Sequence, residues 1–232
     1  MVELVDKQTD MLALDLVNTL IPPLKKEDTI QRALDWMGQF RLSELAVVDN
    51  GIFIGLLNEE MLYDANNPEM LIKDLELFHT NAFVGEKTHF YEVIKVAADN
   101  NVQIVAVVGE EDKRFKGLIT LKDTAMALAR VYATQNPGAT FVLQMDYFDY
   151  SLSEISRLIE ENGAKVLSSF VETNPQNQQE LRLTIKLNSQ EISHIIATLE
   201  RFGYTIIAKF EEGQSDEWTK DRLDMFFKIL DI

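Results

Sequence analysis

The sequence contains no cysteine among its 232 residues, which excludes disulfide bonds, thiolate nucleophiles and cysteine-ligated metal sites. Its three histidines, His79, His89 and His194, are scattered without a spacing that suits a metal ion, and His194 is most simply a surface residue. Basic residues are few, since 22 Lys and Arg stand against 38 Asp and Glu. The resulting net charge of −16, with no basic cluster to meet a phosphate backbone, argues against a nucleic-acid-binding protein.

Long hydrophobic runs and signatures of common enzymes are also missing. No apolar run approaches about 18 residues, so no membrane-spanning helix is expected. The first residues have no basic segment leading into an apolar one, and we therefore expect a cytoplasmic protein. No Walker loop, Gly-x-Gly-x-x-Gly or Gly-x-Ser-x-Gly run occurs. We predict that the protein is not an enzyme.

What the sequence does contain is an internal repeat. Residues 28–62 and 88–124 share one pattern of amphipathic helix, apolar strand, short hairpin, second strand and helix. The helix faces are Ile30, Ala33, Leu34 and Met37 in the first copy and Phe90, Val93, Ile94 and Ala97, each 60 residues later, in the second. After the hairpin the spacing is 62, because residues 109–115 are two residues longer than their counterpart. Two such units would each leave an apolar face for the other to cover.

Local signals define the ends of several elements. Asp28 or Thr29 is expected to cap the first helix, and Asn50-Gly51 between apolar runs predicts a tight hairpin. Residues 134–138 are a linker by composition. From there to residue 211 the predicted order is β-α-β-β-α-β, the ferredoxin-like arrangement, with Ser151 as one helix cap and Asn188 or Ser189 as the other.

The last segment, 214–232, predicts an amphipathic helix. Trp218, Leu223, Phe226 and Leu230 form its apolar stripe, and acidic residues gather towards its N-terminal end. We expect the helix to dock rather than remain in water. Its own subunit, a neighbouring subunit and a regulated partner all remain candidate docking sites.

The duplicated unit resembles the CBS domain, and two in tandem resemble the Bateman module. The residues that carry the resemblance are the strand after Asp49-Asn50-Gly51 and the run Gly117-Leu118-Ile119-Thr120-Leu121-Lys122-Asp123. In that family a Gly-x-x-Thr/Ser-x-x-Asp run meets a ribose phosphate. The resemblance implies that Thr120 contacts a phosphate, that Asp123 accepts ribose hydroxyls, and that Ala82, Phe83 and Val84 hold the adenine.

Independent physical arguments accompany these assignments. A hydroxyl at a helix start presents itself and nearby N–H groups to a phosphate, and the helix dipole adds attraction. Lys116, in the loop before Gly117, would reach further phosphates. The alternative is that Thr120 and Asp123 only cap the helix, that the Lys113–Lys116 loop is an ordinary solvated hairpin, and that Phe83 is a core residue. In the first copy, Asn58 and Met61 replace the Thr and Asp, so that site is expected to be degenerate because Met61 cannot accept a ribose hydroxyl.

The third unit resembles the ACT domain, and the order of two CBS repeats and one ACT domain is similar to the acetoin-utilisation AcuB type. ACT domains often bind amino acids at the first strand–helix loop, commonly through Pro-Gly. Here that loop, residues 146–151, has no glycine, which argues against close approach of the backbone to an amino acid.

The expected fold class is therefore α/β and α+β. The expected domains are 15–75 and 76–133 (CBS), 139–211 (ACT-like) and 214–232 (helix). The expected function is regulatory, through AMP, ADP, ATP or S-adenosylmethionine as the ligand, with no obligatory cofactor and with homodimers formed through the CBS or ACT-like units. The alternatives are an interaction protein with vestigial sites and an amino-acid sensor.

Overall fold

The structure is a computed structural model that describes residues 11–174 and 177–211. The chain divides into two compact units between Leu128 and Ala129. Within the described residues, no helix is both long and apolar enough to cross a bilayer. The predicted tail helix, 214–232, lies outside the described residues.

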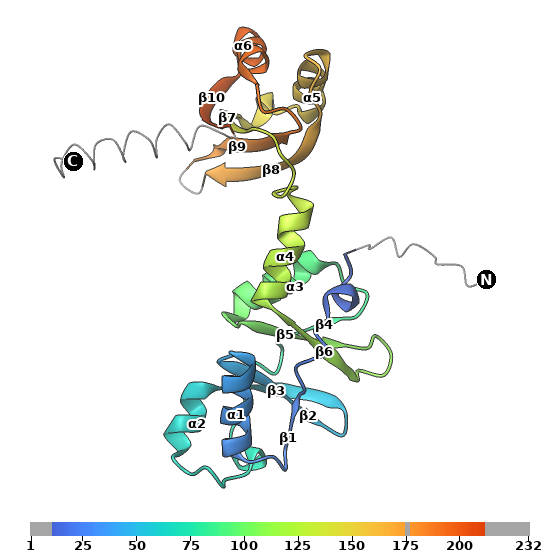
Figure 1. The fold of residues 1–232 in the computed structure, drawn as a ribbon, viewed down its shortest axis with the longest axis vertical. Coiled ribbons are helices and arrows are strands. Elements are labelled where there is room, and N and C mark those ends of the chain that lie inside the picture. Colours follow the sequence, from blue (N-terminus) through green and yellow to red (C-terminus); the bar gives the residue numbers. More distant parts are fainter. Residues whose placement is uncertain (1–10, 175–176, 212–232) are drawn as a thin grey trace, which may run out of the picture. The chain divides into compact units, whose positions relative to one another are not determined.

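The first unit contains the two copies predicted from the repeat (Figure 1). The elements of the first copy are β1 (Leu24–Lys25), α1 (Ile30–Phe40), β2 (Glu44–Asp49), β3 (Ile52–Asn58) and α2 (Glu59–Ala65). Those of the second copy are β4 (Phe83–Gly85), α3 (Phe90–Asn100), β5 (Ile104–Val108), β6 (Phe115–Thr120) and α4 (Leu121–Val131). Short 3₁₀ helices, η1 (Ala13–Leu16) and η2 (Ile72–Asp74), precede them. Both copies follow the predicted β-α-β-β-α order.

Each copy forms a three-stranded sheet, β1-β2-β3 and β4-β5-β6, with a parallel first pair and an antiparallel second pair. The registers coincide: Glu44 pairs with Asn58 as Ile104 pairs with Thr120, which reproduces the predicted spacings of 60 and 62. A register shift falls at the same place in each copy, after Val47 and after Val107. The repeat is therefore confirmed at the level of single residues.

The strands β2 and β5 form the cores of their sheets because they are apolar along almost their whole length. All of β5 is buried, and in β2 only Asp49 is partly exposed. The hairpin turn predicted at Asn50-Gly51 is present, with φ of 49° and 82°. Thr29 caps α1 by accepting the amide of Arg32, whereas Asp28 instead accepts the amide of Lys25 at 2.7 Å.

The second unit contains β7 (Thr140–Asp146), η3 (Tyr147–Asp149), α5 (Leu152–Glu161), β8 (Val166–Asn174), β9 (Asn177–Leu187), α6 (Ser193–Arg201) and β10 (Thr205–Phe210). The strands form an antiparallel sheet in the order β10-β7-β9-β8, and α5 and α6 cover one of its faces (Figure 1). The core between sheet and helices includes Phe141, Leu183 and Ile195.

One helix cap differs from its prediction. Ser151 caps α5 as expected, by accepting the amide of Glu154. However, α6 begins only at Ser193, and neither Asn188 nor Ser189 caps it. The Asn188 side chain accepts the amide of Lys165 at 2.7 Å, and the Ser189 hydroxyl donates to the Glu191 carbonyl. The prediction failed because these side chains stabilise a turn before the helix, a competition that residue type alone does not decide.

Candidate functional site

The start of α4 carries a closed pair of polar side chains. Thr120 is the last residue of β6 and is buried. Its hydroxyl donates to Asp123 Oδ2 at 2.7 Å and accepts the Asp123 amide at 3.1 Å, while the same Oδ2 accepts the Thr120 amide at 3.0 Å. This reciprocal capping fixes both side chains. The other carboxylate oxygen of Asp123 takes no part in these three bonds.

At the corresponding position of the first copy, a single side-chain hydrogen bond caps the helix. Asn58 ends β3 and accepts the amide of Met61 at 2.9 Å, which caps α2. Because Met61 has no carboxylate, no reciprocal bond forms. Asn58 and Thr120 occupy equivalent register positions, so the two copies differ in the side chains that the sequence singled out.

The segment that precedes each copy forms backbone hydrogen bonds with the last strand of the other copy. The Asn18 amide donates to the Leu118 carbonyl of β6 at 2.8 Å, and the Leu56 amide of β3 donates to the Phe78 carbonyl, also at 2.8 Å. Gly117 permits the first crossing, since its φ is +148° and a Cβ there would collide with Val17. The third strand of each copy therefore lies against a segment of the other.

This crossing builds a cavity of about 590 Å³ at Thr120 and Asp123. Its wall combines residues of both copies: Asn18, Leu20, Ile21, Phe40, Arg41, Leu42, Gln103, Thr120, Leu121, Lys122, Asp123 and Met126. Side chains of Leu20, Leu121 and Met126 are more than half exposed, which gives the cavity an apolar rim. A polar floor and an apolar rim suit a ligand with both a polar and a flat apolar part.

Two cations stand in the lining. Arg41 is the residue after α1, in the left-handed conformation with φ of 56°, and Lys122 lies in the first turn of α4. Both are exposed, and neither side chain forms an ion pair within the described residues. In a chain with a net charge of −16, two cations without carboxylate partners beside one cavity provide a local attraction for an anion.

The structure does not bring Ala82, Phe83, Val84 or Lys116 into this lining. The Ala82 carbonyl accepts the amide of Ala106, and Phe83 packs edge-on against Phe53 of the first copy at 6.1 Å. Lys116 lies 3.6 Å from Asp112 in its own hairpin. Asn18, Leu20 and Ile21 line the cavity instead, because the segment before the first copy crosses to β6. The repeat does not point to these residues, since the first-copy equivalents of 82–84 are residues 22–24.

A buried carboxylate, Glu44, lies at the seam between the two copies. It is 8% exposed and accepts the amide of Gln103 at 2.7 Å. Burial raises the pKa of Glu44, although bonds from the Gln103 and Ile104 amides oppose the shift. Gln103 also lines the cavity at Asp123, so Glu44 supports one of its walls. The sequence analysis missed this residue, because nothing local marks Glu44 as buried.

The raised pKa predicts a pH-dependent stability. Between the unfolded value near 4.5 and the higher folded value, the folded chain binds more protons at Glu44, so this residue's contribution to stability falls as pH rises. The stability of the wild type relative to Glu44→Gln should therefore decline from pH 4 upwards and become constant above the folded pKa. Urea unfolding of both proteins at several pH values measures this difference, and an increase with pH would contradict it.

The second unit has a cavity of about 640 Å³ where β7 meets α5. Its lining includes Asp146, Phe148, Asp149, Glu154 and Tyr204. Burial, followed by the nearby Glu154, raises the pKa of the Tyr204 phenol. The loop is the glycine-free segment noted in the sequence, and Asp146 ties it internally by accepting the Phe148 amide. The three carboxylates make the surroundings acidic.

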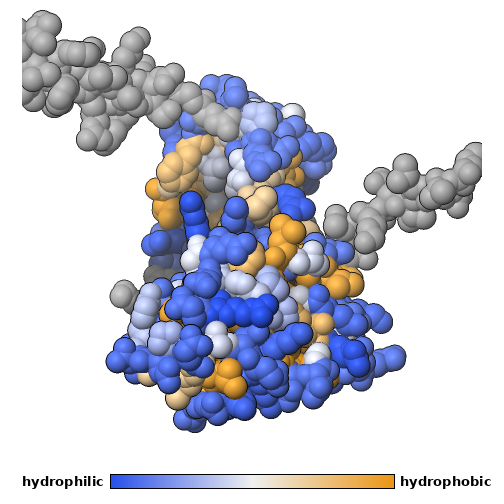
Figure 2. All heavy atoms as spheres, turned by 60° about the horizontal axis from the view of Figure 1, so that its bottom comes forward, coloured by the Kyte–Doolittle hydropathy of each residue, from blue (hydrophilic) through white to orange (hydrophobic). Residues whose placement is uncertain are grey.

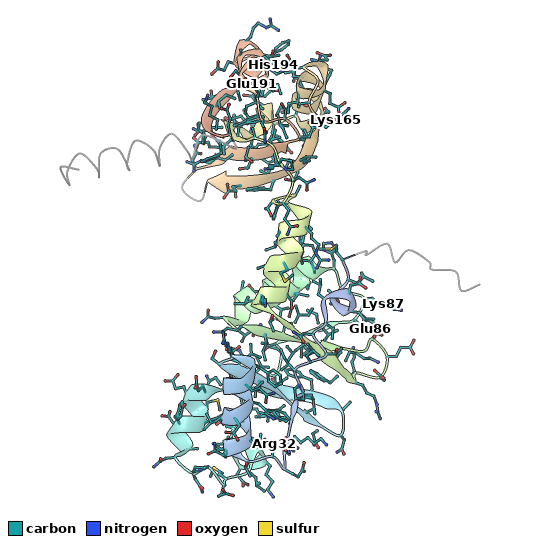
Figure 3. The ribbon with its side chains drawn as sticks, viewed as in Figure 1. Arg32, Glu86, Lys87, Lys165, Glu191 and His194 are labelled. Atoms are coloured by element: carbon teal, nitrogen blue, oxygen red, sulfur yellow. The ribbon has the colours of Figure 1, made fainter. Side chains whose placement is uncertain are left out.

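No arrangement that suits metal binding appears in the described parts of the chain, where no three His, Cys, Asp or Glu residues gather. His89 caps α3. His194, which Figure 3 labels on the second unit, has its ring 3.1 Å from the Asn162 carbonyl. Glu191, labelled beside His194, has a lowered pKa because Ser193 donates hydrogen bonds to it. These groups have local structural partners.

One protein-family model matches part of the chain. Residues 72–130 match the model of the CBS domain, a stretch that includes β4 to β6, Thr120 and Asp123. A comparison with curated proteins found no match.

Three solved structures are similar to part of the chain. A CBS domain pair/ACT domain protein from Thermotoga maritima is 26% identical with a TM-score of 0.47, over 51% of this chain and 96% of that one. CBSX2 in complex with AMP is 14% identical with a TM-score of 0.44, over 52% and 97%. The cytosolic domain of the Mg²⁺ channel MgtE in complex with ATP is 22% identical with a TM-score of 0.43, over 50% and 48%.

Proposed function

We propose that this chain is a non-enzymatic regulatory protein that binds an adenosine nucleotide in the cavity at Thr120 and Asp123. The observation that carries the proposal is the fixed Thr120–Asp123 pair on the floor of a cavity walled by both copies. The CBS match at 72–130 includes this pair, which supports the assignment. We infer that AMP, ADP and ATP are the leading ligand candidates.

Each part of a nucleotide has a partner in the lining. The second carboxylate oxygen of Asp123 would accept ribose hydroxyls, and Leu20, Ile21 and Met126 would pack against the base. The phosphates would meet Arg41, Lys122 and the Lys122 amide. That amide is the usable N–H group of the first turn, since the Leu121 and Asp123 amides already donate to Gln103 and Thr120. The cavity volume of about 590 Å³ falls within the usual range of ligand sites.

A ligand in this position would couple the two copies. Arg41 and Leu20 come from the first copy, whereas Asp123 comes from the second. A nucleotide that contacts both favours the arrangement in which both contacts form, and it can shift an equilibrium only by that difference in affinity. We propose that this bias is transmitted to the ACT-like second unit or to a homodimer partner. Figure 2 shows hydrophobic patches on a mostly hydrophilic surface, and these patches are candidate contact sites for such a partner.

A thermal-shift screen tests the proposal. AMP, ADP, ATP, S-adenosylmethionine and amino acids are each added to the full chain. A nucleotide present at 100 times its dissociation constant should stabilise the protein by about 2.7 kcal/mol. Stabilisation by amino acids alone would favour the acidic cavity of the second unit and the amino-acid sensor. No stabilisation by any of these compounds would favour an interaction protein with vestigial sites.

A further inference from the structure

The second unit leaves one face of its sheet without a helix. Core residues such as Phe141 and Leu183 point towards α5 and α6, so the residues between them in sequence point the other way. The registers place four of these outward residues in one row across the sheet: Ala208, Val142, Thr184 and Phe170. We call this surface the open face.

The open face carries apolar residues in this row and a phenylalanine on each edge strand, with the polar residues Gln144, Arg182 and Lys186 in the neighbouring rows. Phe210 on β10 is 62% exposed and Phe170 on β8 is 37% exposed. At the β8 edge, Tyr132 packs against Phe170 at 5.2 Å, and its carbonyl accepts the Ser168 hydroxyl at 2.9 Å. Phe210 and the Tyr132–Phe170 pair therefore offer apolar contacts at both edges of this face.

We propose that the C-terminal segment 212–232 of the same chain docks on the open face. The described chain ends at Glu211, directly after β10, and β10 is the edge strand that carries Phe210. The segment that follows contains the apolar residues Trp218, Leu223, Met225, Phe226, Phe227, Ile229, Leu230 and Ile232. A segment rich in apolar residues therefore begins at the border of a face that carries exposed aromatic side chains.

The dimensions agree with this occupant. Residues 216–230 as a helix would measure about 22 Å, at about 1.5 Å per residue. The three strand spacings from β10 to β8 amount to about 14 Å, at about 4.8 Å each. A helix that begins beside Phe210 can therefore cross every strand and reach Phe170. Such a path would leave residues 212–215 for the turn between β10 and the helix.

Tryptophan fluorescence tests the docking in the full chain. The protein has two tryptophans, Trp36 and Trp218, so Trp36→Phe leaves Trp218 as the only reporter. Its emission should lie at shorter wavelength, and be quenched less by acrylamide, than that of the synthetic peptide 212–232. Adding Phe170→Ser or Phe210→Ser should move the emission towards the peptide value. Emission that equals the peptide value before any further change would overturn the proposal.

The matched control is Phe202→Ser, which removes a phenylalanine that is 50% exposed at the end of α6 and should leave the emission unchanged. A chain ending at Glu211 should bind more of a hydrophobic dye than the full chain while keeping the same oligomeric mass. A smaller oligomer, or emission that changes with protein concentration, would identify a second copy as the occupant and overturn docking within the chain. Unchanged dye binding would also overturn it.

Discussion

Asp123→Ala should lower the affinity for the nucleotide by at least about 100-fold, which corresponds to about 2.7 kcal/mol of binding free energy. The substitution removes the carboxylate that faces the cavity and that would accept ribose hydroxyls. It also removes the two bonds that Thr120 donates to the carboxylate, so the reciprocal half of the α4 cap is lost and the protein loses about 1 kcal/mol of stability, whereas the Thr120 hydroxyl still accepts the amide of residue 123. Isothermal titration calorimetry of the variant and the wild type with AMP, ADP and ATP measures the affinity.

Two controls separate these effects. Thr29→Ala removes the cap of α1, outside the cavity lining, and should cost a similar stability without changing affinity. Met61→Ala alters the equivalent position of the first copy and should also leave affinity unchanged. Wild-type affinity in Asp123→Ala would rule out this assignment of the site.

Gly138→Ala should destabilise the second unit by at least about 3 kcal/mol, the largest stability effect that we predict. Gly138 has a φ of +150°, and a Cβ there would collide with the backbone carbonyl of Leu187. Its own carbonyl accepts the Lys186 ammonium at 2.9 Å, so a shift of the backbone would also disturb that bond. Differential scanning calorimetry should show one transition at a markedly lower temperature.

The matched control for this change is Gly38→Ala in α1. No atom lies within 4 Å of a Cβ at Gly38, and alanine favours a helix interior. This variant should therefore be as stable as the wild type or up to about 1 kcal/mol more stable. A Gly138→Ala protein that melts like the wild type would show that the chain takes a different path at residue 138.

Local and repeated features could be predicted from the sequence. The helix faces, the Asn50-Gly51 turn and the caps at Thr29 and Ser151 depend on residues within one turn of each other. The two-residue difference in hairpin length also gave the correct register for Thr120. Such features follow from short-range bonding and periodicity, which the sequence records directly.

Features that depend on the crossing of the two copies could not be predicted. The resemblance assigned Ala82, Phe83 and Val84 to the second-copy site, whereas none of the three lines the cavity at Thr120 and Asp123. The crossing segment brings Leu20 and Ile21 there instead, and the end of α1 brings Arg41. Glu44 was missed for the same reason, because its burial comes from contact with Gln103, 59 residues away. A contact between residues this far apart in sequence produces no periodic pattern from which it could be predicted.

A calorimetric titration of the full chain with AMP, ADP and ATP tests nucleotide binding at the Thr120–Asp123 cavity without any substitution. We predict that at least one of the three binds with a stoichiometry of one per chain, because only the second copy has the Thr120–Asp123 pair. Two sites per chain would contradict the assignment to the second copy. The absence of binding by all three nucleotides would contradict the proposed function itself.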